Sequence, residues 1–113
     1  MIELIRSYGI KNFPDIDCEY VAFDCGVVAI RDCIFGGKEI HVAFKRGHRH
    51  KARACVDDLC NSLGCDVWAL IEDQYKHAVN MAKKLGFVFI CKSKGARMDG
   101  TITEVHVLKR VKK

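Results

Sequence analysis

The sequence predicts a single α/β (α+β) domain over residues 1–113, with two main helices packed on a mixed, mostly antiparallel sheet of six to seven strands. Three observations support this prediction. Asp66–Phe87 has the pattern of a strand, a turn, an amphipathic helix, a glycine and a second strand. Residues 19–44 are rich in β-branched and aromatic side chains and are broken by short turns, which is typical of an antiparallel meander. Half of the residues are apolar, so the chain can bury an ordinary core.

The first residues, Met1–Tyr8, mix charged and apolar side chains, and we expect them to form the first strand. They contain no apolar stretch with the length of a signal peptide or a membrane helix, so we expect a cytoplasmic protein without a membrane partner. Seven cysteines are present, none of them in a Cys-x-x-Cys pattern. In a reducing compartment they are expected to pack as small apolar residues.

Three strands are expected in the N-terminal half, at Glu19–Asp24, Val27–Ile34 and Lys38–Phe44. Cys25-Gly26 suits the turn between the first two, and Gly36-Gly37 suits the next turn. A helix then follows a basic loop, because apolar residues recur at helical spacing before the terminating Gly64. This stripe consists of Ala52, Cys55, Val56, Leu59 and Leu63.

The strand–helix–strand unit begins with the apolar run Val67–Ile71, in which Trp68 is expected to be a packing residue. Glu72 and Asp73 follow, where negative charge stabilises a helix N-terminus. The helix stripe consists of Tyr75, Ala78, Ala82 and Leu85, and Gly86 supplies a left-handed ending. The last strand pair is predicted at Phe87–Lys92 and Ile102–Val111, joined by the polar segment Ser93–Gly100.

Positive charge is concentrated in the C-terminal two-thirds of the chain. Residues 1–37 hold three basic and six acidic side chains, whereas residues 38–113 hold sixteen basic and eight acidic ones. Lys45, Arg46, Arg49, Lys51 and Arg53 fall within nine residues at a strand–helix junction. Such a cluster can bind a phosphorylated ligand or nucleic acid, or it can be a solvated helix entrance.

Two segments resemble motifs of the GCN5-related N-acetyltransferase (GNAT) family, especially its short, divergent members from tailed phages. Ile40–Ala52 (Ile-His-Val-Ala-Phe-Lys-Arg-Gly-His-Arg-His-Lys-Ala) is similar to the family's fourth strand and pyrophosphate loop. Trp68–Phe87 is similar to its fifth strand and the helix that ends in Leu-Gly-Phe. The resemblance covers residues 38–92. It implies a trimmed version of the fold, because only residues 9–18, interrupted by Pro14, stand where the family usually has one or two helices.

The resemblance implies acetyl-coenzyme A as the cofactor, with its phosphates at the N-terminus of a helix, where backbone N–H groups are unpaired. The cofactor-binding residues that it implies are Val42, Ala43, Phe44, Arg46, Gly47, Arg49, His50, Lys51, Ala52 and Asn80. Two registers of the family's loop fit in part: the small positions become Arg49 and Lys51, or Ala52 and Ala54. Neither register supplies a glycine there. The additional arginines and lysines could pair directly with phosphate oxygens, or could indicate another anionic ligand.

The catalytic residues depart further from the family. The family often has a tyrosine that protonates the departing thiolate, and this chain has Met81 at that position. The nearest tyrosine, Tyr75, is a candidate catalytic residue. A general base must lie close to the splayed strand ends, and the candidates by location are His41 and Glu72, followed by Glu39 and Asp73. For His41, a purely structural role is the simplest alternative. Acetyl transfer can also proceed by direct attack once the amine and the thioester are aligned.

Three functions therefore stay open. The first is an acetyl-CoA-dependent N-acyltransferase acting on an amine of a protein or small molecule. The second is a catalytically inactive phage accessory or virion protein that binds a macromolecular partner. The third is a small basic nucleic-acid-binding protein, for which Lys109–Lys113 and the central cluster would be the footprint. A zinc site is not expected, because Cys55 and Cys60 diverge around a helix. Exposed sheet edges could support a homodimer.

Overall fold

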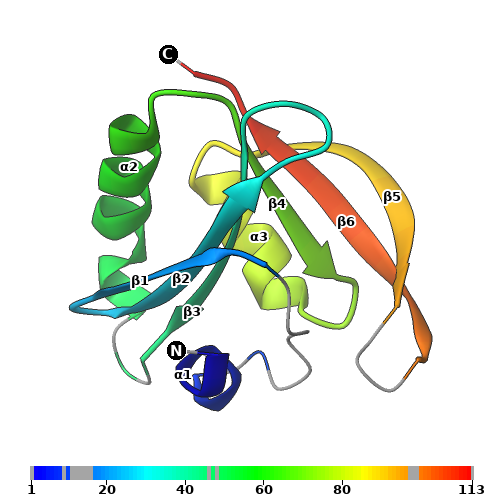
Figure 1. Cartoon of the computed structure of the whole chain (residues 1–113), viewed down its shortest axis with the longest axis horizontal. Coiled ribbons are helices and arrows are strands. Elements are labelled where there is room, and N and C mark those ends of the chain that lie inside the picture. The colour runs from blue at the N-terminus through cyan, green and yellow to red at the C-terminus, as the bar shows by residue number, and fades with distance from the viewer. Residues whose placement is uncertain are drawn as a thin grey trace.

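A six-stranded sheet organises the chain, shown in Figure 1 as a computed structural model. The structure describes residues 2–8, 10, 17–45, 47, 49–96 and 100–112, with the backbone alone at residues 49 and 96. The elements are α1 (Ile2–Ser7), β1 (Glu19–Phe23), β2 (Gly26–Asp32), β3 (Lys38–Phe44), the 3-10 turn η1 (Arg49–Lys51), α2 (Ala52–Leu63), β4 (Val67–Glu72), α3 (Lys76–Lys84), β5 (Val88–Ala96) and β6 (Ile102–Arg110). The expected mixed sheet is confirmed, with the order β1-β2-β3-β4-β6-β5 and one parallel pair, β3 with β4.

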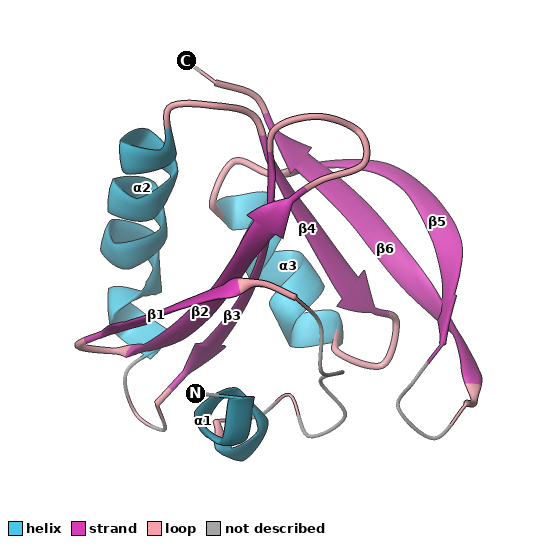
Figure 2. Ribbon diagram, in the orientation of Figure 1, coloured by secondary structure: helices cyan, strands magenta, loops and turns pink. Residues whose placement is uncertain are grey.

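The two faces of the sheet bury different groups of side chains. Figure 2 shows α2 and α3 covering one face, and α1 lies against β2 and β3. Because successive strand residues point to opposite faces, Val28 and Ile30 of β2 join the core beneath α2 and α3. Val27 and Ala29 point the other way, into a second cluster with Ile5 of α1. The domain therefore has a helix face and an α1 face.

The prediction of a strand over Met1–Tyr8 is wrong, since residues 2–7 form helix α1. Ile5 is fully buried on β2 and β3, and Ile2 packs beside it three positions earlier, which is a helical spacing. Glu3 and Arg6 lie at the ends of this helix where its dipole favours their charges. The mixture of charged and apolar residues was therefore a sign of a short amphipathic helix.

The helix endings follow the prediction. Gly64 ends α2 with a left-handed φ of 63°, and Gly86 follows α3 with a φ of 91°. The prediction for Glu72 and Asp73 is wrong, because α3 begins at Lys76 and has no acidic residue in its first turn. Glu72 ends β4 instead. A hydrogen bond between His106 and Asp73, with 2.6 Å between Nε2 and Oδ1, holds the pKa of Asp73 below its usual value.

Two further details concern the central and C-terminal strands. Trp68 is a packing residue, as expected: it is buried, and its Nε1 donates to the carbonyl oxygen of Gly36 over 3.0 Å. The C-terminal hairpin is longer than predicted, because β5 continues through Ser93 to Ala96. No helix in the described part of the chain is both long and apolar enough to cross a membrane.

The parallel strands β3 and β4 separate halfway along their length. They pair only from Lys38 to Ile40 on β3 and from Val67 to Ala69 on β4. Beyond Ile40, β3 stays paired with β2, and beyond Ala69, β4 stays paired with β6. Each strand is thus held on its outer side while the inner sides diverge. A gap therefore opens between β3 and β4 beyond this short parallel contact.

Candidate active site

A pocket of about 480 Å³ lies where β3 and β4 diverge. Its lining residues alternate along both strands between the helix face and the α1 face. From β3, Ile40 and Val42 face the helices, whereas Glu39 and His41 face the α1 side. The pocket therefore passes through the sheet and is open to residues of both faces.

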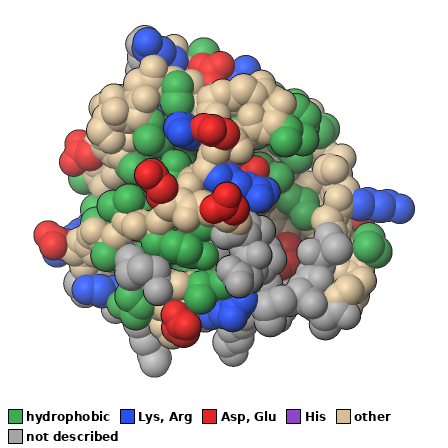
Figure 3. Space-filling view, viewed as in Figure 1, with side chains coloured by type: hydrophobic (Ala, Val, Ile, Leu, Met, Phe, Trp, Pro, Cys, Tyr) green, Lys and Arg blue, Asp and Glu red, His purple; other side chains and the backbone are tan. Residues whose placement is uncertain are grey.

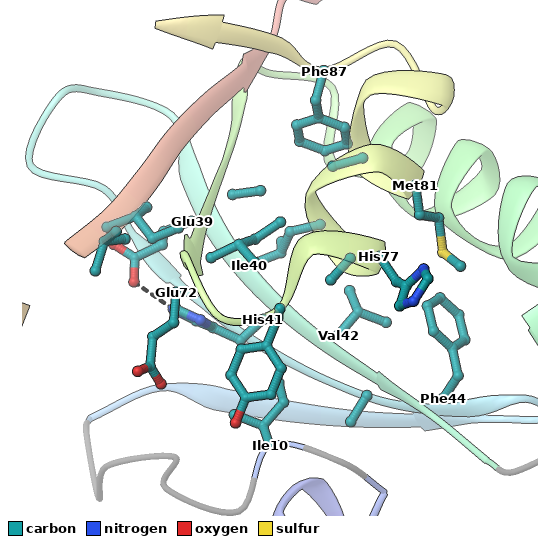
Figure 4. A pocket seen from close by; sticks show the side chains of 18 of the residues that line it. Ile10, Glu39, Ile40, His41, Val42, Phe44, Glu72, His77, Met81 and Phe87 are labelled. Atoms are coloured by element: carbon teal, nitrogen blue, oxygen red, sulfur yellow. Dashed lines mark hydrogen bonds and ion pairs between the residues drawn. The ribbon is translucent and has the colours of Figure 1, made fainter. Parts of the chain in front are cut away.

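The helix side of the pocket is apolar. Figure 4 shows Val42 and Phe44 of β3 close to Met81 of α3, with Phe87 deeper in the core. Other lining residues on this side come from β4, α2 and α3: Val56, Ala69, Ile71, Ala82 and Leu85. The surface can accommodate an extended apolar or amide chain that enters between the strands.

The α1 side of the pocket is polar. Glu39 is almost completely buried, and its Oε2 accepts hydrogen bonds from Nε of Arg31 at 3.0 Å and from Nε2 of His41 at 2.6 Å. Glu72, Tyr8 and Thr103 line the same side. Figure 4 shows Glu72 beside the Glu39–His41 pair. The strand gap thus brings together two carboxylates, a histidine and a guanidinium group.

The protonation of this group follows from its contacts. Burial alone would raise the pKa of Glu39, but the hydrogen bonds and charges of His41 and Arg31 outweigh it, so the pKa lies below 4.5. At neutral pH the Glu39 side chain is therefore a carboxylate, which can only accept hydrogen bonds. His41 must then donate to it through Nε2.

The start of α3 adds further lining residues to the pocket, only some of which were predicted. Tyr75, the N-cap residue of α3, lines the pocket, and so does Met81, at the position where the family often has a tyrosine. His77 also lines the pocket and is drawn near Phe44 in Figure 4, but it was not predicted as a site residue. The sequence feature that could have indicated His77 is its position in the first turn of the helix that follows β4.

The predicted phosphate loop leads directly into α2. Arg46 and the neighbouring His48 lie outside the described residues. Gly47 has a left-handed φ of 83°, and η1 carries the chain into α2 at the buried Ala52. Lys51, the N-cap residue of α2, makes no capping side-chain bond, and the first turn contains no acidic residue. His50 and Lys51 are exposed. The start of α2 thus carries exposed positive charge and no acidic residue.

The structure places some of the remaining predicted residues in the pocket lining and others outside it. Val42, Ala43 and Phe44 all line the pocket, Ala43 from the α1 side. Asn80 is exposed on α3 and is not among the lining residues. Asp73 is bonded to His106 and does not line the pocket either. Within the described residues, no group of three or more His, Cys, Asp or Glu side chains is placed to hold a metal ion.

Solved structures share this fold, although no protein-family model matches the sequence and no curated protein sequence is significantly similar to it. A chimera of the spermidine N-acetyltransferase SpeG from Vibrio cholerae with hSSAT superposes with a TM-score of 0.65 at 15% identity, covering 77% of this chain and 57% of that one. A GNAT-family acetyltransferase from Streptococcus pneumoniae gives 0.63 at 12% identity, with 79% and 60% covered. The protein yncA from Salmonella typhimurium, assigned as an acetyltransferase and solved with acetyl-CoA, gives 0.61 at 18% identity, with 77% and 57% covered.

These similarities lie at the level of three-dimensional structure. The chain spans little more than half the length of the SpeG chimera and of yncA. The shared part includes most of this chain. The chain therefore has the fold of the GNAT-family acetyltransferases.

Proposed function

We propose that this chain is an acetyl-CoA-dependent N-acetyltransferase that acts on an amine. The observation that carries the proposal is the pocket that passes through the sheet between β3 and β4. A transferase for two substrates needs both reacting groups to meet while each is bound by its own surface. Here an apolar surface on the helix side and a polar surface on the α1 side meet at one gap.

The residues on the helix side fit acetyl-CoA. The N-terminus of α2 has backbone N–H groups without a side-chain cap, no acidic neighbour in the first turn, and exposed His50 and Lys51, as phosphates require. The diverging edges of β3 and β4 offer backbone groups to the amides of a pantetheine chain. When bound, acetyl-CoA supplies an acetyl group activated as a thioester.

The residues on the α1 side supply the base. An amine acceptor is protonated in water and must lose a proton before it can attack a carbonyl carbon. His41 is the base that accepts this proton, while Glu39 fixes the ring through Nε2 and stabilises the resulting imidazolium ion. Glu72, on the same side, attracts the cationic amine. Tyr75, which lines the pocket from the start of α3, is the candidate donor of a proton to the departing thiolate.

The experiment that tests this proposal is calorimetric titration with acetyl-CoA and with coenzyme A. We expect micromolar binding by the unmodified chain and binding at least tenfold weaker in Lys51→Glu, at the start of α2. The matched control is Lys94→Glu, an exposed lysine on β5, on the other side of the molecule from α2 in Figure 1. It makes the same charge change and is expected to keep the affinity. Equal weakening in both variants would mean that net charge alone drives binding.

An absence of heat with the folded protein at millimolar ligand would overturn the proposal. It would favour a GNAT-like scaffold that binds a macromolecule, an alternative suggested by Met81 at the usual tyrosine position. A nucleic-acid partner has less support. On the face shown in Figure 3, acidic side chains are interspersed among the basic ones, and the lysines and arginines do not gather into one patch.

A further inference from the structure

Two cysteine thiols meet beside the predicted phosphate loop. Cys25, in the turn between β1 and β2, is fully buried, and Cys55 is the fourth residue of α2. Their Sγ atoms are 2.6 Å apart, although the residues are 30 positions apart in the sequence, and both thiols are free. A disulfide bond is about 2.05 Å long, so the sulfur atoms need to approach by only about 0.5 Å to be joined.

The contact spans the loop between β3 and α2. The carbonyl oxygen of Cys25 accepts a hydrogen bond of 2.8 Å from the backbone N–H of Lys45, at the start of the loop. Gly26, the next residue, pairs with Phe44 at the end of β3. Cys55 lies four residues beyond Lys51, where the loop ends. A bond between the two sulfur atoms would therefore fix both ends of the loop relative to each other.

We propose that Cys25 and Cys55 form an oxidation site, in which a low-molecular-weight disulfide such as oxidised glutathione converts the two thiols into a reversible intramolecular disulfide. The Cys55 thiolate attacks one glutathione sulfur and releases the other as a thiolate. The Cys25 sulfur, on losing its proton, then displaces the second glutathione. The two protein thiols are oxidised by two electrons in total, and oxidised glutathione is reduced to two glutathione thiols.

The environment of the two thiols determines this order of reaction. Burial, followed by the contact with Cys55, raises the pKa of Cys25 to about 11, so this residue stays a thiol near neutral pH. Cys55 is only partly buried and can be reached by an external disulfide. Cys25 cannot easily be attacked from outside, but it lies in position to resolve a mixed disulfide formed at Cys55.

The test uses the full reduced chain, incubated in glutathione buffers of increasing oxidised fraction, then alkylated, digested and analysed by mass spectrometry. We expect one internal link, between the Cys25 and Cys55 peptides, with a mass lower by two hydrogen atoms and restored by a reductant. Cys91→Ser is the matched control, because Cys91 is exposed on β5 and outside the contact. It should form the same link, whereas Cys55→Ser should not.

Two outcomes would overturn the proposal. One is mixed disulfides with glutathione alone, without an internal link in the folded protein. The other is internal links spread over several cysteine pairs, including Cys60 or Cys65. A second measurement on the unmodified chain does not depend on any variant. The linked form should unfold at a higher temperature than the reduced form, because the link restricts the unfolded chain, and an unchanged or lower midpoint would contradict this expectation.

A consequence for the cofactor follows and rests on the proposed function. Fixing both ends of the loop pre-organises the N-terminus of α2, so the linked form should bind acetyl-CoA several-fold more tightly than the reduced form. Equal or weaker affinity of the linked form would overturn this consequence. If neither form binds acetyl-CoA, the proposed function fails, while the peptide map still decides on the oxidation site.

Discussion

Replacing Glu39 by glutamine separates the charge of this buried residue from its volume. The carboxylate accepts two hydrogen bonds, from Arg31 and His41, through one oxygen. Charge-assisted hydrogen bonds contribute about 1.5–3 kcal/mol each and neutral ones about 0.5–1.5 kcal/mol, so the change costs about 1–1.5 kcal/mol per bond. The Arg31 side chain is 39% exposed, and water offsets part of its loss. We therefore expect Glu39→Gln to lower the free energy of unfolding by about 2 kcal/mol.

This loss can be measured by thermal and urea unfolding. With an unfolding entropy of about 2.1 cal/mol/K per residue, 2 kcal/mol corresponds to a decrease of about 8 °C in the melting temperature of the 113-residue chain. The pH dependence gives a second check. The folded-state pKa of Glu39 is lowered from 4.5, so its contribution is complete above about pH 4.5 and is lost as the pH falls through the depressed folded pKa. The difference between the two proteins should therefore shrink in acid.

Glu104→Gln is the matched control. The Glu104 side chain is 58% exposed on β6 and lies 3.7 Å from Nζ of Lys92. The same substitution there should change the free energy of unfolding by less than about 0.5 kcal/mol. A similar effect in both variants, or a Glu39 effect that does not diminish in acid, would refute the assignment of the stabilisation to the buried carboxylate.

Three further predictions concern the core, the sheet and the reaction. Leu108→Ala removes a fully buried side chain from the helix-face core and should cost about 3–5 kcal/mol in urea unfolding; a loss under 1 kcal/mol would contradict that packing. Gly26→Ala places a Cβ atom 2.1 Å from the carbonyl oxygen of Ala43, so we expect a loss of about 3 kcal/mol or more by the same assay, and a neutral result would show that β2 and β3 are farther apart. His41→Gln should slow acetyl transfer, measured as coenzyme A release, by about 10²–10⁴-fold with unchanged acetyl-CoA affinity; a rate within threefold would exclude His41 as the base.

Local patterns were sufficient to predict most of the secondary structure. Strand β3 has the predicted bounds of Lys38 and Phe44, because an apolar alternation there is bounded by a glycine turn and a basic loop. Helix α2 and its ending at Gly64 were equally readable from spacing and glycine chemistry. The N-terminal helix was missed because six residues provide too short a pattern to distinguish a helix from a strand, and its decisive contact, Ile5 on β2 and β3, is tertiary.

The candidate site was predictable in part. His41 and Glu39 share one face of a strand by their spacing of two, and Arg31 lies directly opposite Glu39 in the hairpin register. Their hydrogen bonds could therefore have been inferred from the hairpin. The approach of Cys25 to Cys55 could not, because the packing of α2 against the β1–β2 turn has no local sequence signal.

The sequence by itself determined the order of the elements from β1 to β6, the two helix endings and the basic entrance to α2, since each depends on residues close together in the chain. Only the tertiary structure decided where β3 and β4 separate, and that separation creates the pocket through the sheet. The reason is that strand pairing joins residues that are far apart in the chain. β2 and β6 pair with the outer sides of β3 and β4, whereas the inner sides pair only over Lys38–Ile40 and Val67–Ala69, which no local sequence pattern indicates.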